Sequence, residues 1–177
     1  MTAQLKRAAR LARTTLLGGL VLATMAAVPA QAQAAEYYQI RALHSNRCLD
    51  VAHASAAHMA NVLQATCVNG YNQQWEKVYT DSNYFKLRPR HVANKCLDVA
   101  HGSIGHMADV IQADCWSPGY NQQWGTFQTV NGYGQIRARH SNKCLDVAHM
   151  NKAHGADVIQ GDCWNGDNQR WRFFRTS

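Results

Sequence analysis

The sequence predicts an all-β fold in which one structural unit is used three times. The motif Asn-Arg/Lys-Cys-Leu-Asp-Val-Ala-His recurs at a fixed spacing, with its cysteine at Cys48, Cys96 and Cys144. A second cysteine follows each of these 19 residues later. Short alternating apolar segments bounded by turn residues recur with the motif, and no segment after residue 34 shows a sustained helical period. A fixed period indicates a repeat architecture, so a site present in one unit is expected in up to three copies.

Residues 1–34 are predicted to be a secretory signal peptide. Four basic residues open this segment, an apolar run from Leu16 to Val28 follows, and Ala30-Gln31-Ala32 offers a small-x-small cleavage site. The apolar run is shorter than the ~20 residues of a membrane-spanning helix. We therefore expect a secreted, extracellular protein without membrane insertion. The alternative is an uncleaved helix at a membrane surface.

Removing this segment changes the charge of the protein. The whole chain has 18 Lys+Arg and 11 Asp+Glu, a net charge of +7. Four of the basic residues lie in the signal peptide and no acidic residue precedes Glu36, so the remainder has 14 basic and 11 acidic residues, a net charge of +3. These charges are mixed along the chain, and we therefore do not expect nucleic acid as a partner.

Residues 35–177 are expected to form one domain, with repeats at about 37–80, 81–130 and 131–177. This length leaves no room for a separate catalytic domain. All six cysteines lie in this part, which fits an oxidising compartment. The repeat favours one disulfide within each unit: Cys48–Cys67, Cys96–Cys115 and Cys144–Cys163. The paired cysteines are too far apart for the Cys-x-x-Cys knuckles of a zinc site, so no metal is expected there.

Each repeat is predicted to contain four short strands. The first is expected at Tyr38–Ala42, Phe85–Arg88 and Gln135–Ala138. A tight turn follows at Ser45-Asn46, Ala93-Asn94 and Ser141-Asn142. The Cys-Leu-Asp-Val segment is the second strand. A loop rich in small residues and histidine leads to the third, at Val62–Gln64, Val110–Gln112 and Val158–Gln160. The fourth strand carries the tryptophan of an Asn-Gln-x-Trp motif.

Four short strands cannot bury their own apolar face, so the three units are expected to share one core around a threefold axis. The expected core consists of the leucine of each Cys-Leu-Asp-Val strand, one aliphatic residue of each first strand and the motif tryptophans: Leu49, Leu97, Leu145, Ile40, Leu87, Ile136, Trp75, Trp124 and Trp171. We assign these tryptophans to packing rather than recognition, because large rings at equivalent positions suit a shared core.

The combination of Cys-Leu-Asp-Val, a second cysteine and a terminal Gln-x-Trp, present three times, resembles the ricin B-chain-type lectin domain. The fold implied by this resemblance is the β-trefoil. The match covers essentially all of the chain after the signal peptide. A single Gln-x-Trp would be weak support, whereas three in phase with three cysteine pairs are specific.

The resemblance implies a shallow sugar site in each unit. The residues it assigns are an aspartate of the second strand and the asparagine of the closing motif: Asp50 with Asn72, Asp98 with Asn121, and Asp146 with Asn168. A carboxylate is a strong acceptor for adjacent hydroxyls, and an amide both donates and accepts. Gln73, Gln122 and Gln169 are assigned supporting roles. The alternative for the aspartates is a carboxylate bonded to local backbone.

The aromatic residue that stacks on the sugar is harder to assign. The family commonly has Trp or Tyr two residues before the second cysteine, where this chain has Ala65, Ala113 and Gly161. The candidates that remain lie after that cysteine: Trp116, Tyr120, Trp164 and Tyr71. Val68 and Asp167 interrupt this pattern, so repeat two is richest in aromatic residues and repeat one poorest. The alternative is that these rings only pack the loop.

All nine histidines lie in the repeats, three in each. One of each set follows the motif aspartate by three residues, and we expect these three to flank the sugar: His53, His101 and His149. Sugar affinity would then change between about pH 5 and 8. A metal site built from the His-x4-His pairs is a weaker interpretation, because that spacing is not a recognised zinc pattern. We expect no metal and no cofactor.

Together these observations predict a secreted, monomeric lectin that binds glycans without catalysis through up to three shallow sites. The resemblance makes galactose-type sugars or xylan-like polysaccharide the expected ligands. A glycosidase would need paired carboxylates about 5–10 Å apart. Repeats two and three have additional acids, such as Asp114 and Asp162, but repeat one has Thr66 at the corresponding position. A protein-binding trefoil, such as a secreted inhibitor or toxin subunit, is the second alternative.

Overall fold

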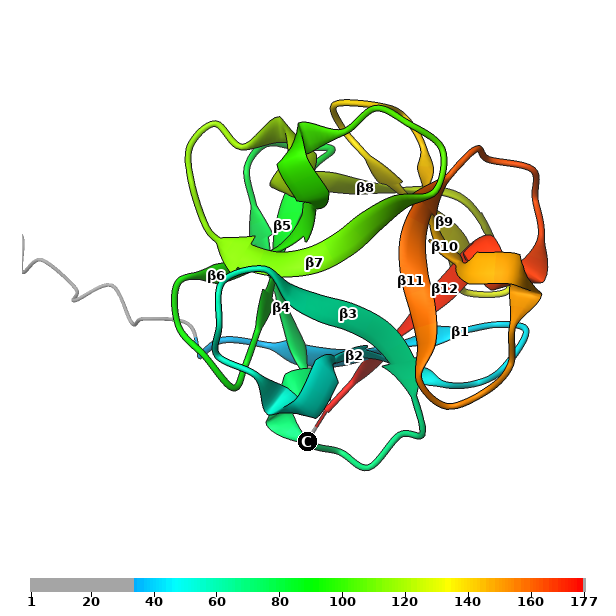
Figure 1. Cartoon of the computed structure of the whole chain (residues 1–177), viewed down its shortest axis with the longest axis horizontal. Coiled ribbons are helices and arrows are strands. Elements are labelled where there is room, and N and C mark those ends of the chain that lie inside the picture. Colours follow the sequence, from blue (N-terminus) through cyan, green and yellow to red (C-terminus); the bar gives the residue numbers. More distant parts are fainter. Residues whose placement is uncertain (1–33, 177) are drawn as a thin grey trace, which may run out of the picture. The chain divides into compact units, whose positions relative to one another are not determined.

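The computed structural model describes residues 34–176. The predicted signal peptide, apart from its last residue, lies outside the described residues. Residues from Ala34 onward form one compact unit. Its strands and turns recur in three similar groups (Figure 1).

Twelve strands occur in three consecutive groups of four. Repeat one contains β1 (Tyr37–Ala42), β2 (Cys48–Val51), β3 (Ala60–Ala65) and β4 (Trp75–Tyr79). Repeat two contains β5 (Phe85–Pro89), β6 (Lys95–Val99), β7 (Ala108–Asp114) and β8 (Trp124–Val130). Repeat three contains β9 (Tyr133–Ala138), β10 (Cys144–Val147), β11 (Ala156–Gly161) and β12 (Arg170–Arg175). Every predicted strand is present at its expected place.

Six single-turn 3-10 helices were not predicted, because three residues are too short to show a period. Three of them follow the Cys-Leu-Asp-Val strands: η1 (Ala52–Ala54), η3 (Ala100–Gly102) and η5 (Ala148–Met150). The other three carry the motif asparagine: η2 (Tyr71–Gln73), η4 (Tyr120–Gln122) and η6 (Asp167–Gln169). Within residues 34–176, no helix has the length and apolar character needed to cross a membrane.

The strands form a closed barrel with a triangular cap. The barrel runs β1–β4–β5–β8–β9–β12 and returns to β1, entirely through antiparallel pairs. The cap consists of the hairpins β2–β3, β6–β7 and β10–β11, and its inner strands β3, β7 and β11 pair with one another at the centre of Figure 1. Closure of both layers leaves few free sheet edges. This is a β-trefoil, as the sequence predicted.

An asparagine occupies the tight turn between the first two strands of each repeat. Asn46, Asn94 and Asn142 have φ angles of 54°, 60° and 57°. Asparagine tolerates this left-handed conformation better than most residues, which explains its recurrence there. The turn brings the chain back so that β2, β6 and β10 begin with the first cysteine of each repeat or directly before it.

One hydrophobic core joins the three repeats, and all nine residues expected in it are fully buried. Each motif tryptophan also donates its indole N–H to the carbonyl oxygen of the motif leucine, at 3.0 Å for Trp75, 3.1 Å for Trp124 and 2.8 Å for Trp171. The tryptophans therefore attach each cap hairpin to the barrel, and the assignment to packing is confirmed.

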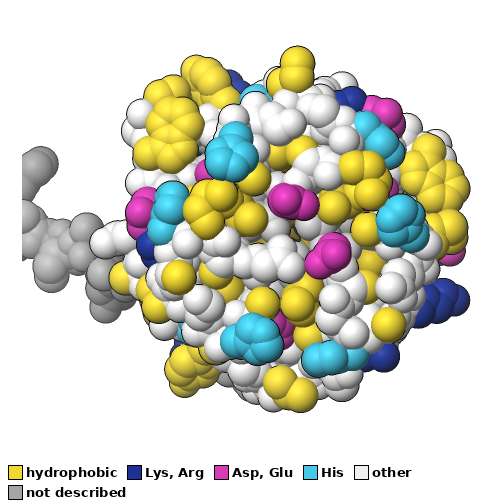
Figure 2. Space-filling view, viewed as in Figure 1, with side chains coloured by type: hydrophobic (Ala, Val, Ile, Leu, Met, Phe, Trp, Pro, Cys, Tyr) yellow, Lys and Arg dark blue, Asp and Glu magenta, His cyan; other side chains and the backbone are white. Residues whose placement is uncertain are grey.

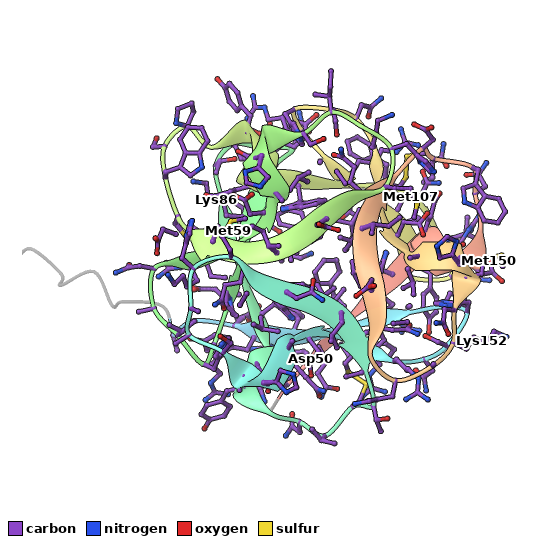
Figure 3. The ribbon with its side chains drawn as sticks, in the orientation of Figure 1. Asp50, Met59, Lys86, Met107, Met150 and Lys152 are labelled. Atoms are coloured by element: carbon purple, nitrogen blue, oxygen red, sulfur yellow. A yellow bond between two sulfur atoms is a disulfide. The ribbon has the colours of Figure 1, made fainter. Side chains whose placement is uncertain are left out.

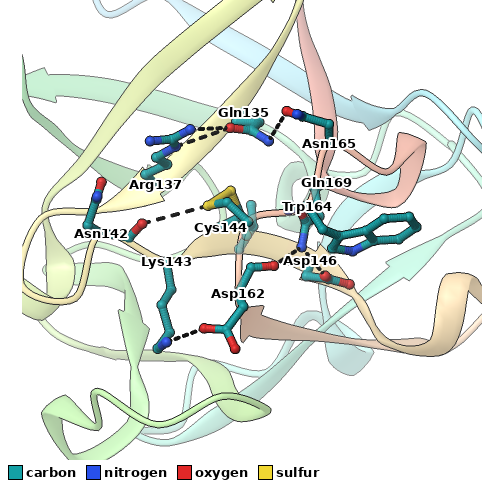
Figure 4. The surroundings of a disulfide bond; sticks show 12 residues. Gln135, Arg137, Asn142, Lys143, Cys144, Asp146, Asp162, Trp164, Asn165 and Gln169 are labelled. Carbon is teal, nitrogen blue, oxygen red and sulfur yellow. Dashed lines mark hydrogen bonds and ion pairs between the residues drawn. A yellow bond between two sulfur atoms is a disulfide. The ribbon is translucent and has the colours of Figure 1, made fainter.

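The three predicted disulfides are present, Cys48–Cys67, Cys96–Cys115 and Cys144–Cys163, each with a Cα–Cα distance of 5.2 Å. Each joins the strand that carries the motif aspartate to the loop before the motif asparagine (Figure 4). Closing a loop of this length stabilises the folded state by about 3 kcal/mol in the chain-entropy estimate.

Replacing Trp124 by phenylalanine should lower the free energy of unfolding by about 1–4 kcal/mol, because it opens a cavity and leaves the Leu97 carbonyl without its donor. Denaturant unfolding followed by fluorescence measures this change. The exposed Trp116 provides the matched control, and Trp116→Phe should change the value by less than about 0.5 kcal/mol. Equal effects at both positions would contradict the structural role of Trp124.

Candidate functional site

Repeat two brings an aspartate and two amides into direct contact. Asp98, on β6, accepts a hydrogen bond from Asn121 Nδ2 at 2.9 Å and another from Gln122 Nε2 at 2.7 Å. Asn121 also donates to the carbonyl oxygen of Val99 at 3.1 Å, and Gln122 to that of Asp114 at 2.8 Å. The 3-10 turn η4 carries both amides, and each bonds a different oxygen of the carboxylate, Asn121 to Oδ1 and Gln122 to Oδ2.

The same cluster occurs in the other two repeats. Asp50 accepts from Asn72 at 3.0 Å and from Gln73 at 2.6 Å. Asp146 accepts from Asn168 at 2.7 Å and from Gln169 at 2.5 Å (Figure 4 shows Asp146 and Gln169). We call the clusters around Asp50, Asp98 and Asp146 site one, site two and site three. The structure thus brings each predicted aspartate to its predicted asparagine, and the bonds described here run to side-chain amides rather than to local backbone.

The motif glutamine connects the carboxylate to the loop after the second cysteine. The Gln122 side-chain oxygen accepts from the backbone N–H of Trp116 at 3.1 Å. Gln73 accepts in the same way from Val68 at 2.9 Å, and Gln169 from Trp164 at 3.0 Å. Each glutamine is fully or almost fully buried. It therefore sets the position of the rim residue relative to the carboxylate.

Burial changes the acidity of the three aspartates. Their exposed fractions are only 6% for Asp50, 4% for Asp98 and 6% for Asp146. Loss of solvent raises the pKa of each carboxyl above its ordinary value, and the hydrogen bonds from the neighbouring amides offset part of this increase. The carboxylates therefore lie at the floor of each site rather than on its outer edge.

Depressions in the surface lie over the first two carboxylates. The depression at site two has a volume of about 500 Å³, and Asp98, Asn121, His101, Trp116 and Tyr120 contribute to its lining. The depression at site one has a volume of about 330 Å³ and is lined by Asp50, Asn72, His53 and Val68, among others. Figure 3 shows Asp50 at its place in repeat one. At these two sites the predicted histidine, aspartate and asparagine lie together.

The exposed aromatic residues are distributed between sites one and two as the sequence predicted, with repeat two richest and repeat one poorest. Trp116 and Tyr120 both line site two, with exposed fractions of 52% and 49%. Site one has the exposed Val68 at the position of Trp116, and Tyr71 lies outside the lining of its depression. Site two is therefore the site with the most aromatic surface.

At site three, the ring of the exposed Trp164 covers Gly166, since a Cβ atom built on that glycine would overlap the ring. The side-chain oxygen of Asn168 is buried and has no hydrogen-bond partner within residues 34–176.

Two arginines that the sequence did not indicate hold the tyrosines of the Asn-Gln-x-Trp turns. The guanidinium of Arg139 lies 5.0 Å from the ring centre of Tyr120 and 4.6 Å from that of Tyr84. Arg90 lies 4.2 Å from the ring centre of Tyr71. Cation–π contacts of this kind restrict the tyrosine ring. No motif signals them, because the partners come from different strands and loops.

His53, His101 and His149 share an unusual backbone conformation, with a φ angle of 56° at each. Non-glycine residues in this left-handed region are uncommon, although histidine is enriched among them. Such a conformation costs about 1–3 kcal/mol and is concentrated at functional sites. The strain thus coincides with the histidines that line sites one and two, and His149 occupies the equivalent place in repeat three.

The additional acids of repeats two and three form ion pairs. Asp114 bonds to Lys95 at 2.5 Å, and Asp162 to Lys143. These contacts lower the pKa of both carboxyls, chiefly through the lysine hydrogen bonds. In the described part of the chain, no group of three or more His, Cys, Asp or Glu residues could hold a metal ion.

The family comparison agrees with the site geometry. Residues 36–171 match the model of the ricin-type β-trefoil lectin domain. A search of curated proteins gave no match.

Solved structures resemble this chain closely in fold. The designed threefold-symmetric protein ThreeFoil is 44% identical, with a TM-score of 0.74, over 77% of this chain and 96% of its own. An exo-β-1,3-galactanase from Clostridium thermocellum is 28% identical, with a TM-score of 0.76, over 81% of this chain and 31% of its own, so the chain spans less than a third of that enzyme. The ricin B-like lectin of Macrolepiota procera, solved with lactose, is 17% identical, with a TM-score of 0.68, over 83% of this chain and 100% of its own.

The triplicated acid–amide clusters, the β-trefoil and the match over residues 36–171 lead to one conclusion. The chain belongs to the ricin-type β-trefoil lectin domain family.

Proposed function

We propose that this protein is a secreted lectin that binds glycans without catalysis through up to three sites. The observation that carries the proposal is the repeated contact between a buried carboxylate and the asparagine of the closing motif. Here the same contact occurs at each of three surface positions and lies below a depression at two of them.

The geometry suits a pair of neighbouring sugar hydroxyls. Each amide bond uses one acceptor position of a carboxylate oxygen, so both oxygens keep further acceptor capacity for a ligand. Hydrogen bonds from hydroxyls to a carboxylate are charge-assisted and stronger than neutral ones. At site two, Trp116 and Tyr120 offer aromatic surface for the apolar face of the sugar. Each site is shallow, and several together give avidity on a multivalent glycan.

Galactose-type sugars are the ligands we favour. Support comes from the Macrolepiota procera lectin, solved with lactose, and from an earthworm R-type lectin solved with GalNAc. These proteins share the fold with this chain at 17% and 18% identity. Xylan-like polysaccharide is the second ligand class to test. We propose that the protein acts as a monomer.

Secretion is supported by the basic and apolar start of the chain and by three disulfides. A role as the binding part of a toxin is the alternative, since the structural relatives include a mosquitocidal holotoxin and the hemolytic lectin CEL-III. In both cases the acid–amide clusters would bind the target glycan, and the first experiment therefore concerns those clusters.

Replacing Asp98 by asparagine should weaken sugar binding at site two about tenfold or more, because a charge-assisted acceptor becomes a neutral amide. The matched variants Asp50→Asn and Asp146→Asn should each remove one site. A glycan array that includes galactose-terminated and xylan oligosaccharides identifies the ligand, and calorimetry with that sugar measures affinity and stoichiometry.

A wild-type protein that binds no glycan on the array would contradict the lectin proposal and favour a protein partner. Unchanged stoichiometry in all three aspartate variants would instead place the sugar elsewhere on the surface. Thermal unfolding of each variant confirms that the fold is retained.

Lowering the pH should weaken binding and at the same time stabilise the fold through these aspartates. Burial raises the pKa of Asp98 above the ordinary value of about 4, so the folded protein takes up this proton at a higher pH than the unfolded chain. Its contribution to stability is therefore greatest in acid and declines as the pH rises through the raised pKa. Protonation also removes the charged acceptor that the sugar needs.

The difference in unfolding free energy between wild type and Asp98→Asn isolates this contribution from other titrating groups. This difference should shift in favour of the wild type as the pH falls, while the affinity of the wild type for sugar declines. A difference that moves in the opposite direction would show that the carboxylate is not desolvated in the folded state.

Replacing His101 by glycine should separate stability from function. Glycine adopts a φ angle of 56° without a Cβ penalty, so the free energy of unfolding should stay the same or rise by up to about 1 kcal/mol. Sugar affinity at site two should fall, because the imidazole is lost from its lining. The control His101→Ala keeps the backbone strain and should not stabilise the protein. Wild-type affinity in His101→Gly would remove this histidine from the site.

A further inference from the structure

We infer that each sugar site is shared between two repeats, and that a histidine of the preceding repeat binds the glycan. This histidine is His154 for site one, His58 for site two and His106 for site three. The inference rests on the proposed function and adds a specificity-determining residue to each site.

The first step concerns the loop that carries His58. This loop follows η1 in repeat one, yet its backbone is bound by repeat two. The buried Gln112 of β7 donates to the carbonyl oxygens of Ser55 and Ala57, both at 3.0 Å. The Nε2 atom of His91 lies 2.9 Å from the same Ser55 oxygen. The loop is therefore held against the neighbouring repeat before any ligand arrives.

The same connection occurs at the other two boundaries. Gln160 donates to the carbonyl oxygens of Ser103 and Gly105, both at 2.8 Å, and Gln64 donates to those of Asn151 at 2.7 Å and Ala153 at 3.0 Å. Each repeat thus extends one loop to the next, and repeat three extends its loop to repeat one. Figure 2 shows histidine side chains spaced around this face of the molecule.

The second step concerns the imidazole ring. His58 Nδ1 accepts a hydrogen bond from the backbone N–H of Asp114 at 3.2 Å. His106 accepts from Asp162 at 3.1 Å, and His154 accepts from Thr66 at 3.1 Å. A neutral ring that accepts at Nδ1 carries its proton on Nε2. At His58 the same Nδ1 atom also lies 3.2 Å from Asp114 Oδ2, and at His106 it lies 3.6 Å from Asp162 Oδ2. As part of the inference we assign the proton of each neutral ring to Nε2, where it is the donor available to a ligand.

The third step concerns the surface depressions that these histidine rings line. His58 and Met59 both line the depression at site two, and His154 lines the depression at site one. Figure 3 shows Met59, which directly precedes β3, beside the end of β7 in repeat two. The His58 side chain is 55% exposed, so its ring is accessible to a ligand. The site floor from one repeat and the rim from another thus meet at one depression.

The floor of the site, from one repeat, and its rim, from the preceding repeat, have complementary hydrogen-bonding chemistry. Asp98 at the floor is an acceptor for sugar hydroxyls, whereas His58 at the rim is a donor. A donor at this place suits a glycan oxygen that carries no proton, such as a ring or glycosidic oxygen. The ligand class is therefore a glycan of two or more sugars, with one sugar over the carboxylate and its linkage near the imidazole.

The experiment uses variants with a single active site. Asp50→Asn with Asp146→Asn leaves site two, and Asp98→Asn with Asp146→Asn leaves site one. His58→Asn is then added to each background, since asparagine can accept from the Asp114 N–H but lacks the Nε2 donor. Lactose and xylotriose are titrated into each protein by calorimetry. His58→Asn should weaken binding about threefold to tenfold when site two remains and less than twofold when site one remains.

His154→Asn should give the reverse pattern, which serves as the matched control. NMR of the histidine rings provides a second measurement that needs no histidine variant: the His58 ring signals should shift when lactose or xylotriose is added to the protein with site two alone. Equal effects of His58→Asn in both backgrounds, or no effect and no shift, would overturn the inference while the lectin proposal stands. Absence of binding to both lactose and xylotriose in the wild type would overturn the inference, and a wild-type protein that binds no glycan on the array would overturn the lectin proposal as well.

Discussion

The contact between a buried carboxylate and two side-chain amides is the constraint on which the rest of each repeat depends. Taking Asp50, Asp98 and Asp146 out of water is unfavourable unless donors replace the lost solvent. The asparagine and glutamine of the closing motif supply these donors, and the glutamine then binds the loop after the second cysteine. A disulfide joins the same two segments covalently. The site is therefore formed before a ligand binds, because its acceptor is also a structural connection of the fold.

The second level of organisation lies between repeats. A hairpin cap could be held by strand pairing alone, yet each repeat also binds the loop of its neighbour through a buried glutamine and a histidine. These bonds give hydrogen-bond donors to backbone carbonyls that would otherwise lack partners at the boundary between two repeats. The nine histidines then fall into three groups with different contacts: one group binds the loop of the preceding repeat, one lies in strained backbone beside its own aspartate, and one reaches the next site.

The sequence predicted the strands, the core, the disulfides and the meeting of aspartate with asparagine, because each follows from a local pattern repeated in register. Leu97 and Trp124, for example, lie at fixed places in motifs, and burial of both was expected from the period alone. The 3-10 turns were missed because a single turn has no period. The stacking of Arg139 on Tyr120 and the contact of His58 with repeat two depend on how distant loops meet in space. His58 was visible as one of nine histidines, but no spacing relates it to Asp98.

Threefold symmetry is kept at the floor of the sites and lost at their rims, and this difference follows from the roles of the residues. A change of Asp98 or Gln122 would disturb buried hydrogen bonds, whereas the rim residues are exposed and can vary without loss of the fold. The position of Val68 holds tryptophan in the other repeats, and Thr66 stands where they have Asp114 and Asp162. Beside the cross-repeat histidine, sites two and three therefore carry an acid bound to lysine, while Thr66 at site one accepts a hydrogen bond from Arg47 at 2.6 Å. If the sites bind sugar as proposed, a common floor with unequal rims would select one type of sugar at every site and leave the neighbouring part of the glycan to distinguish them.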